Sequence, residues 1–128
     1  IPRSIHVANR TTQRAFDLIR LFEGRGKLTA SGLDAIPKTP WDLVINGLSS
    51  GWQEGFPDIA IPALAAAASA YDLIYSDQPT AFIQWSDNRG FKKTSDGLGM
   101  LIEQAADSYA IWHGERPETA GVLADLRT

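Results

Sequence analysis

Residues 4–14 read Ser-Ile-His-Val-Ala-Asn-Arg-Thr-Thr-Gln-Arg, and this stretch decides the fold class. Ser4–Ala8 predicts a short strand that ends at Asn9. A helix is expected over about Thr12–Glu23, with Gly24 as its stop, because apolar residues recur at helical spacing: Ala15, Leu18, Ile19 and Phe22. A strand that leads directly into a helix is the repeating unit of parallel α/β sheets.

The rest of the chain continues this alternation of short apolar runs and helical stretches, so we predict an α/β fold with a parallel sheet. Further strands are expected at Lys27–Ala30, Trp41–Asn46, Ala70–Tyr75 and Phe91–Thr94. Further helices are expected as an alanine-rich segment that starts at Pro62, and at Thr80–Asn88, Leu98–His113 and Glu118–Leu126. The sequence shows no internal repeat, and 128 residues are typical of one domain.

The longest expected helix, Leu98–His113, carries two lines of side chains. The predicted core stripe consists of Leu98, Leu101, Ile102, Ala105, Tyr109 and Trp112. A second line lies off this stripe and consists of Met100, Gln104, Asp107 and Ile111. The second line has two open interpretations: it faces a ligand, or it is covered by another helix.

The composition excludes several classes of protein. With 44% hydrophobic residues and no cysteine, the chain is neither disordered nor a disulfide scaffold, and a cytoplasmic protein is expected. The longest apolar stretch, 59–70, contains Pro62 and is too short to cross a bilayer, so no membrane segment is expected. The first residues, Ile1-Pro2-Arg3-Ser4, lack the pattern of a signal peptide, and we expect them to be a cut end.

Positive charge is concentrated at the start of the chain. Residues 1–28 carry a net charge of +4, whereas the remainder carries −7. A local basic cluster on an acidic protein favours a small anionic ligand, because a nucleic-acid-binding protein usually spreads positive charge over a whole face. The alternative is a solvated helix face with scattered arginines.

The loop after the first expected strand indicates which kind of anion binds. Arg10 and Arg14 flank the expected helix start, where free N–H groups and guanidinium groups bind phosphate. In dinucleotide-binding folds this position reads the adenosine ribose: an acidic residue accepts the 2′-hydroxyl of NAD, and an arginine accommodates the 2′-phosphate of NADP. Between Val7 and Phe16 there is no acidic residue, so NADP is expected. Helix capping explains the threonines of the loop equally well but leaves the arginines unexplained.

The glycine loop that binds a pyrophosphate is missing. Gly24-Arg25-Gly26 follows a helix, and Gly97-Leu98-Gly99 opens one, but neither has the third glycine of the fingerprint. If the chain is a dinucleotide-binding unit, its first strand and glycine loop are expected upstream of Ile1.

Four motifs, in order, resemble the cofactor-binding half of shikimate dehydrogenase. They are Asn9-Arg10-Thr11 with Arg14; Asp42-Leu43-Val44-Ile45-Asn46 followed by Ser49-Ser50-Gly51; Tyr71-Asp72-Leu73-Ile74-Tyr75 followed by Pro79-Thr80; and Asp96-Gly97-Leu98-Gly99-Met100-Leu101-Ile102-Glu103-Gln104-Ala105-Ala106. The resemblance runs from Arg3 to the C-terminus. It implies an enzyme that interconverts 3-dehydroshikimate and shikimate with NADPH, in the pathway to chorismate and the aromatic amino acids.

The resemblance also implies residue roles. The clamp on the 2′-phosphate of NADP falls on Asn9, Arg10, Thr11 and Arg14. Nicotinamide-side cofactor contacts fall on Asn46, Leu73, Gly97 and Met100. Tyr75 and Gln104 would bind the substrate.

Two features depart from the family. Asn46-Gly47-Leu48 stands where the family commonly has Asn-Ala-Thr, so one hydroxyl contact to the cofactor is lost. The lysine and aspartate that transfer the proton belong to an N-terminal substrate domain that this sequence lacks, so no catalytic residue is expected here. His6 and His113 are interpreted as structural, and no metal site is expected.

The resemblance implies a doubly wound, Rossmann-like parallel sheet of strand order 3-2-1-4-5-6. This chain would supply strands 2 to 6 and lack the central first strand, so residues 1–128 are expected to be an NADP-binding domain truncated at its N-terminus, the missing portion being its partner. The expected function is reduction of 3-dehydroshikimate by the parent enzyme. Two alternatives stay open: a non-catalytic nucleotide-binding or complementation module, and a relative that acts on quinate or aminoshikimate.

Overall fold

The computed structural model describes residues 2–48, 56–57 and 59–127. The chain divides into two units, each described by itself below. The first unit comprises Ile1–Pro40 and Asp58–Leu64, and the second comprises Trp41–Pro57 and Ala65–Thr128.

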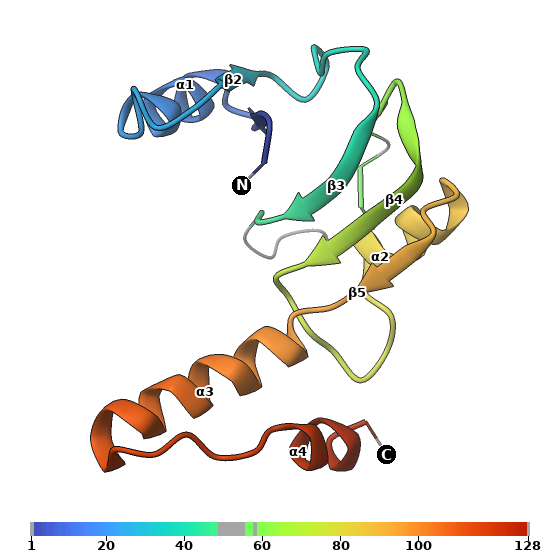
Figure 1. Ribbon diagram of the computed structural model, residues 1–128. Helices are drawn as coiled ribbons and strands as arrows, with labels where there is room; N and C mark the ends of the chain where they lie inside the picture. The colour runs from blue at the N-terminus through green and yellow to red at the C-terminus, as the bar shows by residue number, and fades with distance from the viewer. Residues whose placement is uncertain (1, 49–55, 58, 128) are drawn as a thin grey trace. The chain divides into compact units, whose positions relative to one another are not determined.

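The first unit is a small strand–helix–strand layer (Figure 1). β1 (Ile5–Ala8) and β2 (Leu28–Ser31) pair in parallel, and α1 (Thr12–Arg20) packs on both strands through Ala15, which is 1% exposed. The expected helix continues past Arg20 only as tight turns, which end at Gly24 with a φ of 79°. Leu18 and Phe22 of the predicted helix face are exposed, because the two short strands cover only part of α1.

The second unit contains a three-stranded sheet of order β3-β4-β5. The strands are β3 (Trp41–Asn46), β4 (Leu64–Asp72) and β5 (Lys93–Ser95); β4 and β5 are parallel, and Figure 1 shows the arrows of β3 and β4 pointing the same way. α2 (Ala81–Asn88) buries Phe82 and Trp85, whose rings stack with centroids 5.5 Å apart.

The predicted alanine-rich helix from Pro62 is wrong: these residues form the first part of β4. Alanine favours helices in isolation, but propensity is a weak preference that tertiary contacts override. Here Ala68 and Ala70 are 1% and 2% exposed, and the Ala68 carbonyl accepts a hydrogen bond from Lys92 N at 2.9 Å. The small side chains allow the middle strand to be buried closely between its neighbours.

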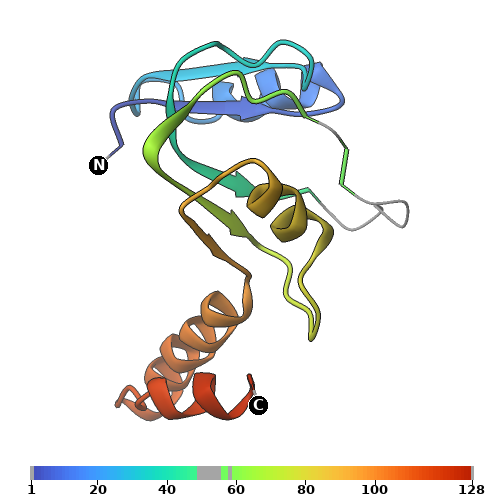
Figure 2. The ribbon, with the colours of Figure 1, turned by 90° about the vertical axis from the view of Figure 1, so that its right-hand side faces the viewer.

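Two helices end the chain (Figure 2). α3 (Leu98–His113) has the predicted bounds, and α4 (Ala120–Asp125) packs against it. The predicted core stripe is largely wrong, because α3 buries only Ile102 and Ala106 within the described chain. Leu101, Tyr109 and Trp112 are 42%, 41% and 77% exposed, since short α4 covers little of the longer helix.

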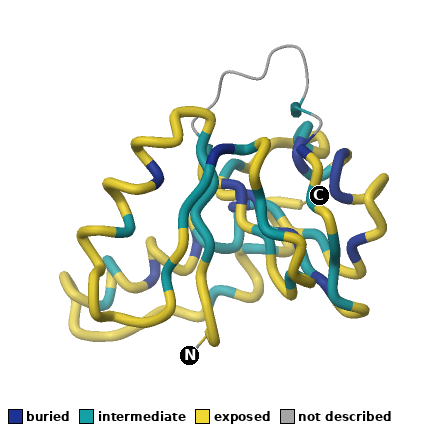
Figure 3. The backbone as a smooth tube through the Cα atoms, turned by 90° about the horizontal axis from the view of Figure 1, so that it is seen from above, coloured by how far each residue is buried: buried dark blue, intermediate teal, exposed yellow. Residues whose placement is uncertain are grey.

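The described strands form two parallel α/β sheets, β1-β2 and β3-β4-β5, with no ladder joining them. This is the α/β class expected from the sequence, in an incomplete form. Figure 3 shows that buried residues occupy short runs and that much of the tube is exposed. Among the described residues, no helix is long and apolar enough to cross a membrane.

Candidate cofactor site

The loop between β1 and α1 is held by local hydrogen bonds. The side-chain oxygen of Asn9 accepts from Thr11 N at 2.8 Å, and Asn9 N donates to the carbonyl of Ser31 at 3.3 Å. Arg14 N donates to the Thr11 carbonyl at 2.9 Å. Asn9 therefore shapes the loop through its side chain, which places Arg10 and Thr11 at the start of α1.

The start of α1 offers unused positive charge. Arg10 and Arg14 are exposed and form no ion pair with any residue that the structure describes. Thr11 is the N-cap residue, yet its side chain makes no capping hydrogen bond, and the first turn has no acidic residue. The alternative explanation of the threonines, helix capping by a side chain, finds no hydrogen bond at Thr11. Free N–H groups and two guanidinium groups make this end suited to a phosphate.

An acidic side chain that the sequence did not single out lies beside this loop. A Cβ at Gly32 would lie 2.5 Å from the Asp34 carboxylate and 2.9 Å from the Thr12 hydroxyl. Asp34 is more than 20 residues from Thr12 in the chain, and the pairing of β1 with β2 brings them to the same end of the sheet. A side chain at position 32 would displace these two oxygens, both of which belong to side chains.

The second group of predicted residues lies at the carboxyl ends of β3 and β4. Leu73 N donates to the Asn46 carbonyl at 3.0 Å, and Gly97 N donates to the Ile74 carbonyl at 3.0 Å. A Cβ at Gly97 would lie 2.3 Å from the Leu73 carbonyl oxygen, and one at Gly47 would lie 3.5 Å from the Leu73 side chain. Asn46, Leu73 and Gly97 therefore form one continuous ledge, from which α3 begins.

Asn46 is buried, and both ends of its side chain are occupied. Its Nδ2 donates to Asp72 Oδ1 at 2.9 Å, and its Oδ1 accepts from Leu48 N at 3.2 Å. At 5% exposure it shapes the turn that follows β3. The residues Ser49, Ser50 and Gly51, which belong to the same motif, lie outside the described residues.

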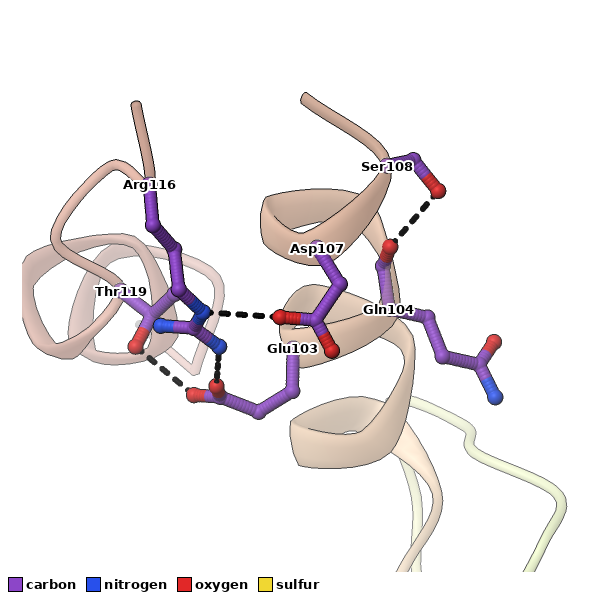
Figure 4. A network of polar contacts seen from close by, with 6 residues as sticks. All are labelled: Glu103, Gln104, Asp107, Ser108, Arg116 and Thr119. Carbon is purple, nitrogen blue, oxygen red and sulfur yellow. Dashed lines mark hydrogen bonds and ion pairs between the residues drawn. The ribbon is translucent and has the colours of Figure 1, made fainter. Parts of the chain in front are cut away.

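Tyr75, Met100 and Gln104 are accessible to different degrees. Tyr75 is 51% exposed two residues beyond Leu73, Met100 is half-buried in the first turn of α3, and Gln104 is exposed one turn later. Figure 4 shows the side-chain amide of Gln104 pointing away from the polar network around Arg116. Within the described residues no hydrogen bond joins the side chains of Tyr75 and Gln104.

That polar network joins α3 to the segment before α4 (Figure 4). Arg116 donates to Asp107 at 2.8 Å and also to Glu103, and the Thr119 hydroxyl donates to Glu103 at 2.7 Å. The hydrogen bonds from Thr119 and then Arg116 lower the pKa of Glu103, and those with Asp107 and then Glu103 raise the pKa of Arg116. The network holds the side of α3 that carries Glu103 and Asp107, and sequence spacing gave no signal for it.

The histidines have structural surroundings. His6 contacts the hydroxyls of Thr29 at 2.8 Å and Ser31 at 2.9 Å, and partial burial lowers its pKa. The His113 ring lies 4.2 Å from the Tyr109 ring at the end of α3. No group of three or more potential metal ligands occurs among the described residues.

The predicted site residues thus form two groups. Asn9, Arg10, Thr11 and Arg14 lie in the first unit, and the remaining predicted residues lie in the second. Each group is placed by the ends of parallel strands, where ligands bind in open α/β sheets.

The sequence of this chain is similar to those of several known proteins. Residues 97–127 match the family model for the shikimate 5'-dehydrogenase C-terminal domain. The shikimate dehydrogenase (NADP(+)) of Alkalilimnicola ehrlichii is 47% identical over 126 residues, which cover 98% of this chain and 46% of that protein. The chain is similar to part of the shikimate dehydrogenases. It spans about half the length of the curated relatives it matches.

Solved structures share the fold. A chorismate mutase/shikimate 5-dehydrogenase fusion protein from Clostridium acetobutylicum matches with a TM-score of 0.75 and 26% identity, over 99% of this chain and 46% of that one. The ligand-free 5-ketofructose reductase of a Gluconobacter strain matches with a TM-score of 0.68 and 27% identity, over 91% and 44%. The resemblance and the Rossmann-like fold class predicted from the sequence are confirmed.

Proposed function

We propose that this chain is the NADP-binding part of a shikimate dehydrogenase, and that the whole protein reduces 3-dehydroshikimate to shikimate. The observation that carries the proposal is 47% identity, over 98% of the chain, to a protein named shikimate dehydrogenase (NADP(+)). NADPH would supply the hydride, and the protein would supply binding, orientation and the proton.

The first unit would hold the adenosine end of the cofactor. Arg10 and Arg14 would bind the 2′-phosphate, and Asn9 and Thr11 would hold the loop in place. Support comes from the exposed arginines, the uncapped amides at the start of α1 and the absence of an acidic residue in its first turn. A phosphate bound by guanidinium groups gains charge-assisted hydrogen bonds that a ribose hydroxyl does not provide.

The second unit would hold the nicotinamide end and part of the substrate. The ledge of Asn46, Leu73 and Gly97 would line the cofactor together with Met100, and Tyr75 and Gln104 would donate hydrogen bonds to the substrate. Met100 and Gln104 lie one turn apart on α3, a spacing that suits one to the cofactor and the other to the substrate.

Proton transfer would need residues from the remaining part of the protein. Reduction of a carbonyl requires a proton donor at its oxygen. His6 does not suit this role, because both of its ring nitrogens contact hydroxyls on β2. The resemblance assigns this role to a lysine and an aspartate of the substrate domain. Residues 1–128 would then be a truncated domain, completed by a first strand that pairs with β1 and β3, in a cytoplasmic enzyme.

A second candidate function is reduction of another polyhydroxylated ketone. The similarity to 5-ketofructose reductase favours it. That protein shares the fold, and its 27% identity to this chain is comparable to the 26% of the shikimate 5-dehydrogenase fusion protein. The dehydro forms of quinate and aminoshikimate are further ketones of this type, and none of the described side chains distinguishes them. A non-catalytic nucleotide-binding module is the remaining alternative.

Steady-state oxidation of NADPH by the whole protein tests the proposal. We expect turnover with 3-dehydroshikimate and a kcat/KM well above that for 5-ketofructose, with NADPH preferred to NADH. Turnover with 5-ketofructose alone would support the second candidate. Cofactor binding without turnover of any of these ketones would indicate a non-catalytic module.

A further inference from the structure

One buried carboxylate connects three segments around the ledge of the second unit. Asp72, the last residue of β4, is 1% exposed. Its Oδ1 accepts from Asn46 Nδ2 at 2.9 Å and from Ile74 N at 3.1 Å, and its Oδ2 accepts from the Thr80 hydroxyl at 2.5 Å. The end of β3, the segment after β4 and the start of α2 therefore share one side chain.

Each of these bonds orients a further group. Because Asn46 donates Nδ2 to Asp72, its Oδ1 faces Leu48 N and closes the turn after β3. The Thr80 hydroxyl donates to Asp72 and accepts from Ile83 N at 3.2 Å, which caps α2. The bond to Ile74 N fixes the backbone between Leu73 and Tyr75.

We infer that Asp72 is a positioning residue for hydride transfer, since it holds both the turn after Asn46 and the segment carrying Leu73 and Tyr75. This inference rests on the proposed function. The carboxylate itself is buried and contacts neither cofactor nor substrate in this role. Small displacements of a reacting pair cost large factors in rate, of about 100-fold for 1 Å.

The chemistry of Asp72 is specific to a carboxylate. It provides two acceptor oxygens to three donors, whereas an asparagine provides one acceptor and one donor group. In Asp72→Asn, an amide nitrogen facing Asn46 Nδ2 and Ile74 N would set donor against donor, and an amide nitrogen facing Thr80 would leave the hydroxyl proton of Thr80 without its acceptor. The side chain keeps its size, so the substitution changes hydrogen bonding with little change in packing.

The first experiment compares Asp72→Asn with Asp87→Asn in the whole protein. Asp87 is an exposed residue of α2 and serves as the matched control. We expect Asp72→Asn to lower kcat at least about 10-fold while the KM for NADPH stays within about threefold, because the arginines of the first unit are unchanged. The isotope effect with NADPH deuterated at the transferred hydrogen should rise. A folded Asp72→Asn protein with the kcat of Asp87→Asn would overturn the inference.

Thr80 provides a second test that does not alter the carboxylate. Thr80→Ser keeps the hydroxyl and should keep kcat, whereas Thr80→Val removes it and should lower kcat in the same direction as Asp72→Asn. Equal kcat values for the serine and valine variants would contradict the inference.

Amide hydrogen exchange separates this inference from the proposed function. Asp72→Asn should accelerate exchange at Leu48 and Ile74 relative to Asp87→Asn, whether or not the protein reduces 3-dehydroshikimate. Unchanged exchange at both amides would overturn the inference alone. Absence of turnover by the unsubstituted protein, with exchange accelerated in Asp72→Asn, would overturn the proposed function and leave Asp72 with a structural role in the turn after β3 and the segment after β4.

Discussion

Gly97 allows α3 to begin directly against the backbone of the preceding strand segment. Its position leaves no room for a Cβ, which would lie 2.3 Å from the carbonyl oxygen and 2.7 Å from the carbonyl carbon of Leu73. Both atoms belong to the backbone and cannot move aside as a flexible side chain would. The glycine of this motif therefore has a packing role in addition to its predicted place beside the cofactor.

Gly97→Ala should destabilise the whole protein by about 1–3 kcal/mol, because an added methyl group displaces the start of α3 from Leu73. Gly99→Ala is the matched control: it lies two residues further along α3, and a Cβ there meets no atom within 4 Å. Alanine in a helix is favoured over glycine by up to about 1 kcal/mol. Denaturant unfolding of both variants measures the difference, and equal stability would contradict the close approach.

The arginine pair makes a prediction about cofactor preference. Replacing Arg10 and Arg14 together by alanine should weaken binding of NADP by at least about 100-fold, because each arginine would supply at least one charge-assisted hydrogen bond of about 1.5–3 kcal/mol. Binding of NAD should change little. Arg25→Ala, an exposed arginine after α1, is the control. Titration calorimetry with both cofactors measures the effect, and equal losses for NADP and NAD would refute the 2′-phosphate role.

For individual residues, the sequence predicted the exposed charges better than the buried polar contacts. Arg10 and Arg14 stood out because local charge and a helix start are visible in the sequence. The hydrogen-bond partners of Asp72 could not be recognised in the sequence, because Asn46 lies 26 residues before it and Thr80 eight residues after it. Only the pairing of strands brings these side chains together, and single-sequence patterns do not contain that pairing.

Among the elements, β4 shows where local preference is a poor guide. Five of its nine residues are alanine, which favours a helix in isolation, yet the segment is the middle strand of its sheet. The bounds of β3 and α3 were predicted correctly, since apolar β-branched residues and long helical periodicity are strong signals. The burial of the side chains of α3 was not predicted correctly, because periodicity does not reveal what covers a helix.

The contact between α3 and the segment before α4 should depend on pH. Hydrogen bonds lower the pKa of Glu103 in the folded chain below its ordinary value of 4.5, so this contact stabilises the fold above that pH. It should be lost as the pH falls through the lowered pKa, when Glu103 is protonated and no longer pairs with Arg116. The resonance of the Arg116 Nη2 group, which donates to Glu103, should shift over this acidic range in NMR spectra.

Two variants test the assignment of that transition. Glu103→Gln should remove the shift of the Arg116 resonance, whereas Glu118→Gln, an exposed carboxylate near α4, should leave it in place. A shift that persists in Glu103→Gln would show that another group titrates.

For the whole molecule, the two small sheets leave apolar side chains uncovered. Leu43 and Ile45 of β3 are 52% and 56% exposed, and Ile5 of β1 is 47% exposed. We expect residues 1–128 expressed alone to bind a hydrophobic dye and to melt without a cooperative transition, because exposed apolar strands lack partners. The whole protein should melt cooperatively. A sharp, dye-free transition of the 128-residue chain would contradict this expectation.

At the molecular scale, the resemblance predicted a parallel α/β sheet without its central strand. The strands of each described sheet follow the implied neighbour relations, with β1 beside β2 and β3, β4 and β5 in order. Sequence patterns alone gave strands and helices but no neighbour relations, since pairing depends on residues far apart in the chain.

The central claim is that the arginines beside α1 bind the 2′-phosphate of NADP. The most direct measurement is a crystal structure of the whole protein with NADP⁺ bound. We predict that the 2′-phosphate lies within hydrogen-bond distance of the Arg10 and Arg14 guanidinium groups. A bound cofactor whose 2′-phosphate lies away from both arginines would contradict the account.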